Sequence, residues 1–273
     1  MRGASLSLGR PVVLGILNVT PDSFSDGGRY EAPEVAVARA SELVAQGADL
    51  VDVGGESTRP GAPPVAAEDE WRRIGPVVRA LAARGVAVSV DTTKESVARR
   101  AIEAGARVIN DVSGLVADPG LAELAAETGT GLVIMHRRGT PRTMQDDVEY
   151  EDLVGEVRSF LGRQVDLALL RGCQPEQLVV DPGLGFGKSA GGSLRLIERL
   201  GEIASLGLPV LVGPSRKSFI GSVLDAGVEE RLEGTLAACV LALDRGARLF
   251  RVHDAGAARR ALDMAEAIRA SGR

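Results

Sequence analysis

One pattern dominates this chain and repeats eight times from near the N-terminus to the C-terminus. Each repeat has a short apolar run that ends in a polar residue, then a loop rich in Gly, Pro, Ser and Thr, then a segment with the spacing of an amphipathic helix. The apolar runs are continuous, as in strands that are covered on both faces. The pattern predicts an α/β protein, a single (β/α)8 TIM barrel, with one domain over residues 1–273.

A doubly wound sheet is the competing arrangement, and the length also allows two small domains. A doubly wound sheet usually gathers its site at one switch point, whereas here polar residues follow every strand, which requires strands arranged around one mouth. The predicted strands are Val12–Asn18, Leu50–Gly54, Val86–Asp91, Val108–Asp111, Leu132–His136, Leu178–Asp181, Pro209–Val212 and Leu249–Val252. Ahead of them, Ser5–Arg10 alternate with Leu6 and Leu8, which predicts a short N-terminal hairpin or barrel cap.

The overall charge narrows the function classes. A net charge of −5 argues against a general nucleic-acid surface or an anionic-membrane surface, so any anion site must be local. Apolar stretches fall short of the roughly 20 residues of a membrane span, and the first ten residues lack a signal-peptide core. We therefore expect a soluble cytoplasmic protein. Cys173 and Cys239 have neither metal spacing nor a disulfide framework and are expected to be packing residues.

The basic residues are unevenly distributed between lysine and arginine. Of the 32 Lys and Arg residues only three are lysines, Lys94, Lys188 and Lys217, and all three follow predicted strand ends. His136 and His253, the two histidines, lie at such ends too. Because a compact ammonium or an imidazole has uses that a guanidinium cannot replace, we expect these positions to be special.

If the strands close into a barrel, the polar residues at their ends converge. These residues are Asn18, Asp52, Asp91, Asn110, Asp181, Lys217, Arg251 and His253. Two carboxylates and an amide, at Asp91, Asn110 and Asp181, suit a flat heterocycle that carries ring N–H and amino groups. Met135 and Arg251 offer faces for stacking against such a ring.

A second subsite needs positive charge and hydrogen-bond donors. Thr58, Arg251, His253 and the loop after Asn18 fit a diphosphate, with Mg²⁺ bound through oxygen ligands that include the Asn18 amide. Asp52 is expected to act at the loop and metal shell. Three arginines after the fifth predicted strand, Arg137, Arg138 and Arg142, form either an anion clamp or a solvated loop, and the sequence leaves both open.

Six motifs together resemble the dihydropteroate synthase family. They are Gly-Ile-Leu-Asn-Val-Thr-Pro-Asp-Ser-Phe-Ser-Asp-Gly-Gly (15–28), Asp-Val-Gly-Gly-Glu-Ser-Thr-Arg-Pro-Gly-Ala (52–62), Asn-Asp-Val-Ser-Gly (110–114), Asp-Pro-Gly-Leu-Gly-Phe-Gly-Lys (181–188), Ser-Arg-Lys-Ser-Phe (215–219) and Arg-Val-His-Asp (251–254). The resemblance implies a transferase that joins 6-hydroxymethyl-7,8-dihydropterin diphosphate to p-aminobenzoate, giving 7,8-dihydropteroate and pyrophosphate. It also implies a homodimer and Mg²⁺ as cofactor.

The same resemblance implies a role for individual residues. The pterin diphosphate would be bound by Thr58, Asp91, Asn110, Met135, Asp181, Gly213, Lys217, Arg251 and His253. The p-aminobenzoate side would be formed by Phe24, Thr58, Arg59, Pro60, Phe186 and Ser218, and Asn18 would bind the metal. The catalytic groups would be Asp91, Asp181, Lys217, Arg251 and His253, which stabilise a developing pterin cation and the departing pyrophosphate without a protein nucleophile.

Two alternatives keep the barrel and change the activity. One is the pterin-binding module of a folate-dependent methyltransferase that works with a corrinoid partner. That function gives no role to Arg59-Pro60 or to Ser215–Ser218. The other is a paralogue that binds the pterin diphosphate without condensing it.

Overall fold

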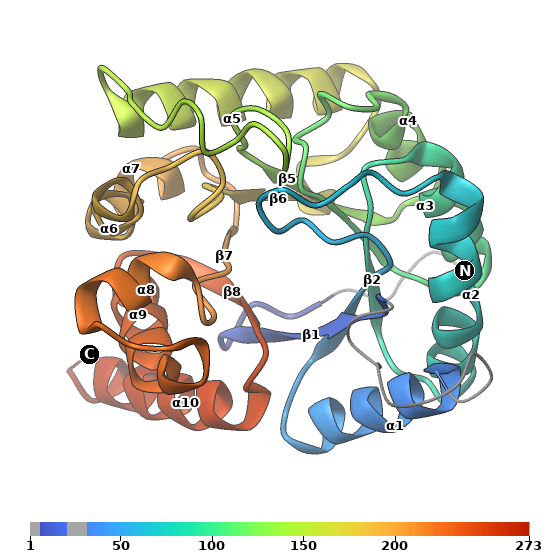
Figure 1. The fold of residues 1–273 in the computed structure, drawn as a ribbon, viewed down its shortest axis with the longest axis horizontal. Coiled ribbons are helices and arrows are strands. Elements are labelled where there is room, and N and C mark those ends of the chain that lie inside the picture. Colours follow the sequence, from blue (N-terminus) through green and yellow to red (C-terminus); the bar gives the residue numbers. More distant parts are fainter. Residues whose placement is uncertain (1–5, 21–31, 273) are drawn as a thin grey trace.

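A computed structural model describes residues 6–20 and 32–272 of the chain. Its eight strands are all parallel and form one closed barrel in the order of the sequence, with β1 hydrogen-bonded to both β2 and β8 (Figure 1). The helices surround the barrel on the outside (Figure 1). The predicted (β/α)8 barrel is therefore confirmed, and the doubly wound sheet is excluded.

All eight strands begin and end within two residues of their predicted positions, and the largest differences are at the starts of β3 and β8. They are β1 Val12–Asn18, β2 Leu50–Gly54, β3 Val88–Asp91, β4 Val108–Asp111, β5 Gly131–Met135, β6 Leu178–Asp181, β7 Val210–Val212 and β8 Ala247–Val252. The helices are α1 Ala32–Ala45, α2 Ala67–Ala83, α3 Glu95–Glu103, α4 Gly120–Thr128, α5 Leu153–Leu170, α6 Ala190–Glu198, α7 Leu200–Ala204, α8 Ser218–Leu224, α9 Leu232–Asp244 and α10 Ala255–Ser271. The described part of the chain also contains the 3-10 turns η2 Pro175–Gln177 and η3 Val228–Glu230.

Alternate strand residues enter two separate apolar layers, as the two-residue period of a strand requires. One set, which includes Val13, Leu17 and Val51, packs with the helices in the large core. The other set forms a small cluster, made of Val12, Leu14, Leu50, Val133, Leu211 and Leu249. This second cluster is an apolar floor inside the barrel, and the polar residues further along each strand lie above it.

The N-terminal segment closes the floor from below. Leu8 packs against the interior cluster, and residues 6–11 contain no strand. Over its described residues the segment is therefore the predicted cap and not a hairpin. Burial explains Leu8 only, because Leu6, the other leucine of the alternation, is exposed.

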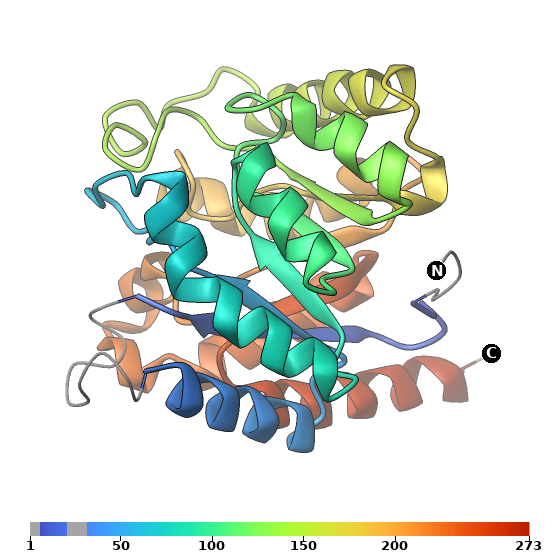
Figure 2. The same cartoon turned by 90° about the vertical axis from the view of Figure 1, so that its right-hand side faces the viewer.

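The loops after the strands gather at one end of the barrel. Figure 2 shows the loops after β2 and β5 projecting from the same end, while α10 ends at the other. The two loops touch, because the Gly61 amide donates to the Pro141 carbonyl at 2.9 Å.

Two expectations from composition can be checked in the fold. Cys173 and Cys239 are both free thiols and buried, as expected for packing residues. Over residues 6–20 and 32–272, the helices are all too short or too polar to cross a membrane.

Candidate active site

The interior of the barrel carries a connected polar layer just above its apolar floor. Asp52 on β2 has no exposed surface, and its Oδ2 accepts from Asn110 Nδ2 at 3.0 Å and from Arg251 Nε at 2.6 Å. Arg251 Nη2 also donates to Asp91 Oδ2 at 2.7 Å. Asp91, Asn110 and Arg251 therefore meet as predicted. Asp52 converges with them as predicted, but its carboxylate lies inside the barrel, where it links β2, β4 and β8, and not in the loop that follows β2.

Burial controls the charge of the carboxylates in this layer. Burial raises the pKa of Asp91 to about 7; the Arg251 guanidinium opposes the shift, and the Asp52 carboxylate adds to it. Burial also raises the pKa of Asp181, against the nearby Lys217 ammonium. Both carboxylates are thus costly to ionise, and a cationic or N–H-rich ligand would favour their charged forms.

Lys217 lies where the loop after β7 meets the loop after β6. Its Nζ donates to the Leu184 carbonyl at 2.5 Å and lies 4.4 Å from the centroid of the Phe186 ring. Burial lowers the pKa of this ammonium to about 8, although Asp181 opposes the shift. A Cβ at Gly213 would lie 3.7 Å from Arg251 Cβ and 3.9 Å from Lys217 Nζ, so Gly213 leaves room between the two cations.

The loop after β6 presses against the end of β5. Met135 is 2 % exposed and lies in register with Asp181 on the neighbouring strand. The Asp181 carboxylate accepts from the Gly183 amide at 2.7 Å. Gly183 has a φ of +67°, and a Cβ there would lie 2.0 Å from the His136 carbonyl oxygen, so only glycine fits.

Three arginines act on His253 at the end of β8. Burial lowers the pKa of His253 to about 4, and Arg251, Arg216 and Arg59 lower it further, while Asp254 acts in the opposite direction. Arg251 pairs with Asp52 and Asp91, and Arg216 pairs with Asp254 and Glu229, so carboxylates balance two of the three guanidinium groups. A neutral imidazole in these surroundings can offer an N–H to an anion.

The remaining predicted site residues are less tightly organised. Asn18 ends β1 with a partly exposed side chain, Thr58 is half-buried, and Arg59, Pro60 and Ser218 are exposed. Phe24 lies outside the described residues. The structure therefore brings the pterin residues together closely and leaves much of the p-aminobenzoate set at the rim.

A cavity of about 260 Å³ adjoins Asp91 between the loops after β2, β3 and β5. Its lining includes Thr58, Arg137 and Arg142, together with two acidic residues that the sequence analysis missed, Glu56 and Glu70. The rare lysine at position 94 was the sequence feature that could have revealed them. Lys94 Nζ contacts Glu56 and donates to Glu70 Oε2 at 2.6 Å. Through these ion pairs, Lys94 supports the base of the loop after β2.

The three arginines after β5 have different positions. Arg137 and Arg142 line the cavity. Arg138 instead pairs with Glu156 at 2.9 Å and with Asp147 at 3.3 Å, and its guanidinium stacks 3.6 Å from the Tyr150 ring centroid. Neither the anion clamp nor the solvated loop describes all three arginines. Two of them line a cavity, and the third forms ion pairs within its own region of the chain.

Lys188, the remaining lysine, is buried behind the site and links two segments of the chain. Lys188 Nζ lies 2.8 Å from His136 Nδ1 and donates to the carbonyls of Phe186 at 2.9 Å and of His136 at 3.3 Å. Burial lowers the pKa of His136 to about 2 and lowers that of Lys188 well below its usual range. The pair joins the end of β5 to the loop that carries Phe186.

The described residues offer Mg²⁺ little more than one ligand. They include no group of three or more His, Cys, Asp or Glu side chains that could hold a metal. Asn18 ends a strand whose Val12 and Leu14 belong to the interior cluster, so by alternation its amide lies on the interior side. Mg²⁺ is commonly held by one or two protein ligands, waters and substrate phosphates, and this donor set fits that mode.

Comparison with known proteins gives a consistent result. The family model described as pterin binding enzyme matches residues 14–253. A dihydropteroate synthase of Escherichia coli K12 is 48% identical over 254 residues, which cover 93% of this chain and 90% of that protein. Both the sequence identity and the coverage are far higher than a shared fold alone would produce.

Solved structures agree over nearly the whole chain. The Xanthomonas albilineans dihydropteroate synthase with 4-aminobenzoic acid has a TM-score of 0.91 at 45% identity, covering 97% of this chain and 95% of that one. The same organism's enzyme in complex with 7,8-dihydropteroate has a TM-score of 0.88 at 42% identity, covering 97% and 96%. This chain belongs to the pterin-binding enzyme family and, within it, to the dihydropteroate synthases.

Proposed function

We propose that this chain condenses 6-hydroxymethyl-7,8-dihydropterin diphosphate with p-aminobenzoate to give 7,8-dihydropteroate and pyrophosphate, a step of folate biosynthesis. The observation that carries the proposal is the polar layer of Asp52, Asp91, Asn110 and Arg251 above an apolar barrel floor. Carboxylates and an amide at this depth match the N–H and amino groups of a pterin edge. Relatives named dihydropteroate synthase support the same reaction.

In this proposal the pterin lies deepest in the barrel. Asp181 and Asn110 bind its N–H groups, Met135 and Arg251 flank the ring, and Lys217 closes the side next to Gly213. The ligand's N–H donors would compensate the cost of ionising carboxylates that burial keeps at a raised pKa.

The leaving group lies toward the end of β8. Arg251 and His253 donate to the diphosphate from one side, and Thr58 donates from the loop after β2. Asn18 would hold Mg²⁺ together with diphosphate oxygens. When bound, Mg²⁺ neutralises charge that develops on the departing pyrophosphate.

The p-aminobenzoate lies at the rim of the mouth. Phe186 and Ser218 form one wall of this subsite, and Phe24, Arg59 and Pro60 form the other. Phe186 is fixed by the Lys188 contact to its carbonyl, so the deeper wall is rigid.

The reaction breaks the bond between the pterin methylene carbon and the diphosphate oxygen and forms a carbon–nitrogen bond to the arylamine, which then loses a proton. As the diphosphate departs, positive charge spreads into the pterin, where Asp91 and Asp181 stabilise it electrostatically. Arg251, positioned by Asp52 and Asp91, stabilises the opposite charge on the leaving group. Loops that exclude water protect the cation from hydrolysis.

The direct test mixes purified protein with the pterin diphosphate, p-aminobenzoate and Mg²⁺ and measures dihydropteroate and pyrophosphate. The synthase releases both in equal amounts. A corrinoid-dependent methyltransferase module or a non-catalytic paralogue binds the pterin and releases neither, and that result would reject the proposal.

We further propose that residues 1–273 act as one pterin-binding domain in the cytoplasm and as a homodimer, without a nucleic-acid or membrane partner. The net charge of −5 and the single closed barrel support this part of the proposal. Sedimentation of the purified protein tests the dimer.

A further inference from the structure

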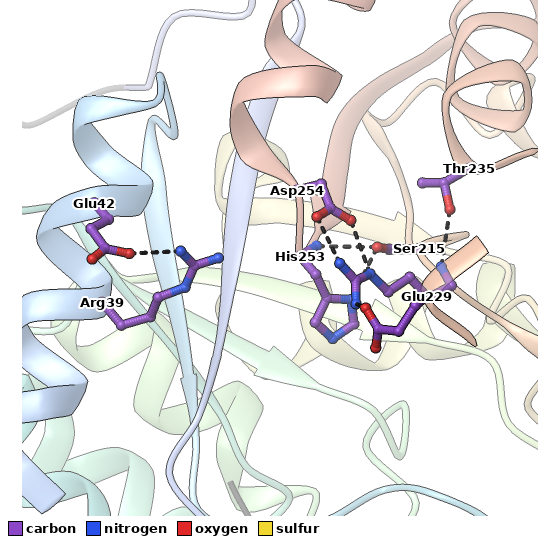
Figure 3. Close-up of polar contacts among 8 residues, drawn as sticks. Arg39, Glu42, Ser215, Glu229, Thr235, His253 and Asp254 are labelled. Atoms are coloured by element: carbon purple, nitrogen blue, oxygen red, sulfur yellow. Dashed lines mark hydrogen bonds and ion pairs between the residues drawn. The ribbon is translucent and has the colours of Figure 1, made fainter. Parts of the chain in front are cut away.

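The hydroxyl group of Ser215 connects the loop after β7 to the end of β8 (Figure 3). Ser215 is 6 % exposed, and its Oγ accepts from the His253 backbone N–H at 3.1 Å. The same Oγ lies 3.0 Å from Nδ1 of the His253 ring. One buried hydroxyl therefore contacts both the backbone and the side chain of the same histidine.

The hydrogen-bond capacity of the hydroxyl decides the direction of the second contact. A serine hydroxyl has one proton to donate, and among the described residues His253 Nδ1 is the acceptor within reach of it. If Nδ1 carried the proton instead, the hydroxyl would accept twice, and its own proton would be buried without a partner. That arrangement is costly, so Nδ1 accepts and the ring proton lies on Nε2.

The loop that carries Ser215 is held firmly enough to enforce this choice. Its next residue, Arg216, has a φ of +55°, an unusual conformation for a residue other than glycine. Thr235 Oγ1 accepts from the Arg216 amide at 3.0 Å (Figure 3). The Arg216 guanidinium donates to both carboxylate oxygens of Asp254, at 3.0 and 2.8 Å. Because Asp254 follows His253, this bidentate pair ties the two segments together beside the histidine.

The surroundings of the ring show which ligand the free Nε2–H would meet. Arg251, Arg216 and Arg59 all act electrostatically on His253, and burial together with these cations lowers its pKa to about 4. Near pH 7 the ring is therefore neutral and has one N–H to offer. Arg251 and Arg216 are already paired with carboxylates, so the fixed Nε2–H is itself a donor that an anion can use.

We propose that Ser215 is a positioning residue that holds His253 in the Nε2–H tautomer, so that the imidazole donates to the diphosphate of the substrate and of the pyrophosphate product. The identity of the anion rests on the proposed function, whereas the tautomer rests on the hydrogen bonds alone. Ser215 acts only through the histidine.

The tautomer can be read directly in the ligand-free wild-type protein. The chain has only two histidines, so a ¹⁵N spectrum of the imidazole nitrogens at pH 7 contains two ring systems, which His136→Gln assigns. We expect a pyridine-like Nδ1 and a pyrrole-like Nε2 for His253. A protonated Nδ1, or rapid exchange between the tautomers, would overturn the proposal even if the enzyme is fully active.

Variants test the consequence for the anion. Ser215→Ala should give a mixture of His253 tautomers and weaken calorimetric binding of inorganic pyrophosphate with Mg²⁺ by about fivefold to tenfold, the effect of one lost hydrogen bond. Ser215→Thr, which keeps the hydroxyl, should restore both. The matched control is Ser222→Ala on the exposed face of α8, where the hydroxyl only bonds to the Ser218 carbonyl, and it should change neither.

The outcomes separate this proposal from the proposed function. Unchanged tautomer and pyrophosphate affinity in Ser215→Ala would refute the positioning role. A wild-type protein that has the Nε2–H tautomer and binds pyrophosphate but forms no dihydropteroate would reject the condensation and leave the role of Ser215 supported.

Discussion

Asp52 and Asp181 are both buried carboxylates in the barrel, but their partners differ. Asp52 bonds to Arg251 and Asn110, whereas Asp181 accepts from a backbone amide and lies near the Lys217 ammonium. The Asp52 carboxylate is thus used within the fold, whereas the Asp181 carboxylate is available to a ligand. Substitution by Asn should therefore lower mainly the stability of the fold at Asp52 and mainly the ligand affinity at Asp181.

We predict that Asp181→Asn weakens pterin binding about tenfold to a hundredfold, the loss of one charge-assisted hydrogen bond, and leaves the free energy of unfolding nearly unchanged. Asp52→Asn should instead lower that free energy by up to about 3 kcal/mol, because Arg251 loses one of two buried partners. Calorimetry with a pterin ligand and urea unfolding measure the two effects. Equal pterin affinity in both variants would remove Asp181 from the ligand subsite.

Lys217 should tolerate arginine poorly. Its ammonium fits between the Leu184 carbonyl, the Phe186 ring and the gap left by Gly213, and a guanidinium is wider and planar. We expect Lys217→Arg to lower kcat/KM about a hundredfold, the cost of misplacing reactants by about 1 Å.

Lys94→Arg is the matched control for this substitution. Lys94 is partly exposed and bridges two carboxylates, an arrangement that a guanidinium can also make, so steady-state kinetics should remain near wild type. Near-wild-type turnover in both variants would show that the rarity of lysine carries no information at position 217.

Stability should depend on pH through Asp91. Its pKa rises from 3.8 to about 7 in the folded protein, so between these values the folded state binds more protons than the unfolded state. Stability therefore falls as the pH rises through that window, at up to about 1.4 kcal/mol per pH unit for one group.

We predict that Asp91→Asn reduces this slope, as measured by urea unfolding at several pH values between 4 and 8. The remaining slope would come from groups such as Asp181, whose pKa burial also raises. A wild-type protein whose stability increases steadily over the same range would contradict the assignment.

Sequence reasoning identified the polar residues that converge at the mouth, including Asp52 and Arg251, but it missed the contacts that these two make inside the barrel. Asp91 and Asn110 were found because each closes an apolar run. Asp52 lies one position from Val53 and two from Gly54, and its partner Arg251 is distant in sequence, so only the closed barrel reveals their contact. Glu70 was missed because an acidic residue in the first turn of α2 is typical of an ordinary helix start.

At the scale of elements, the loop after β6 depends on Lys188. Lys188→Met would leave the carbonyls of His136 and Phe186 without their donor and release the loop from β5. We expect kcat/KM for p-aminobenzoate to fall about tenfold or more through misplacement of Phe186, while calorimetric affinity for a pterin changes little.

Tyr150→Phe is the control for the same loop. It removes one hydrogen bond, from the Tyr150 hydroxyl to the Gly187 carbonyl at 2.7 Å, and should have the smaller effect. Wild-type kinetics in Lys188→Met would show that the loop keeps its position without the tie.

The elements themselves were largely predictable, since Gly and Pro mark where the strands stop. Pro182 ends β6 at Asp181 as expected, and β4 spans Val108–Asp111 as its apolar run predicts. The start of β8 was placed late, because Arg248 interrupts the apolar run there while its side chain pairs with Glu266 on α10. A tertiary contact of this kind leaves no local signal.

At the scale of the whole molecule, closure of the barrel turns a repeated local pattern into one site. The sequence order of the strands places β8 beside β1, so the ends of the first and last strands lie side by side at the mouth. Repetition alone predicted this convergence. The contact between the loops after β2 and β5, and the cavity beneath it, depend on loop conformations that no period or propensity encodes.

A crystal structure with bound 7,8-dihydropteroate would show whether the pterin binds in the interior layer of the barrel. We expect the pterin ring to lie against Asp91, Asn110 and Asp181, with the benzoate end near Phe186 and Ser218. A pterin ring that lies instead in the cavity beside Arg137 and Arg142, away from Asn110 and Asp181, would contradict this expectation.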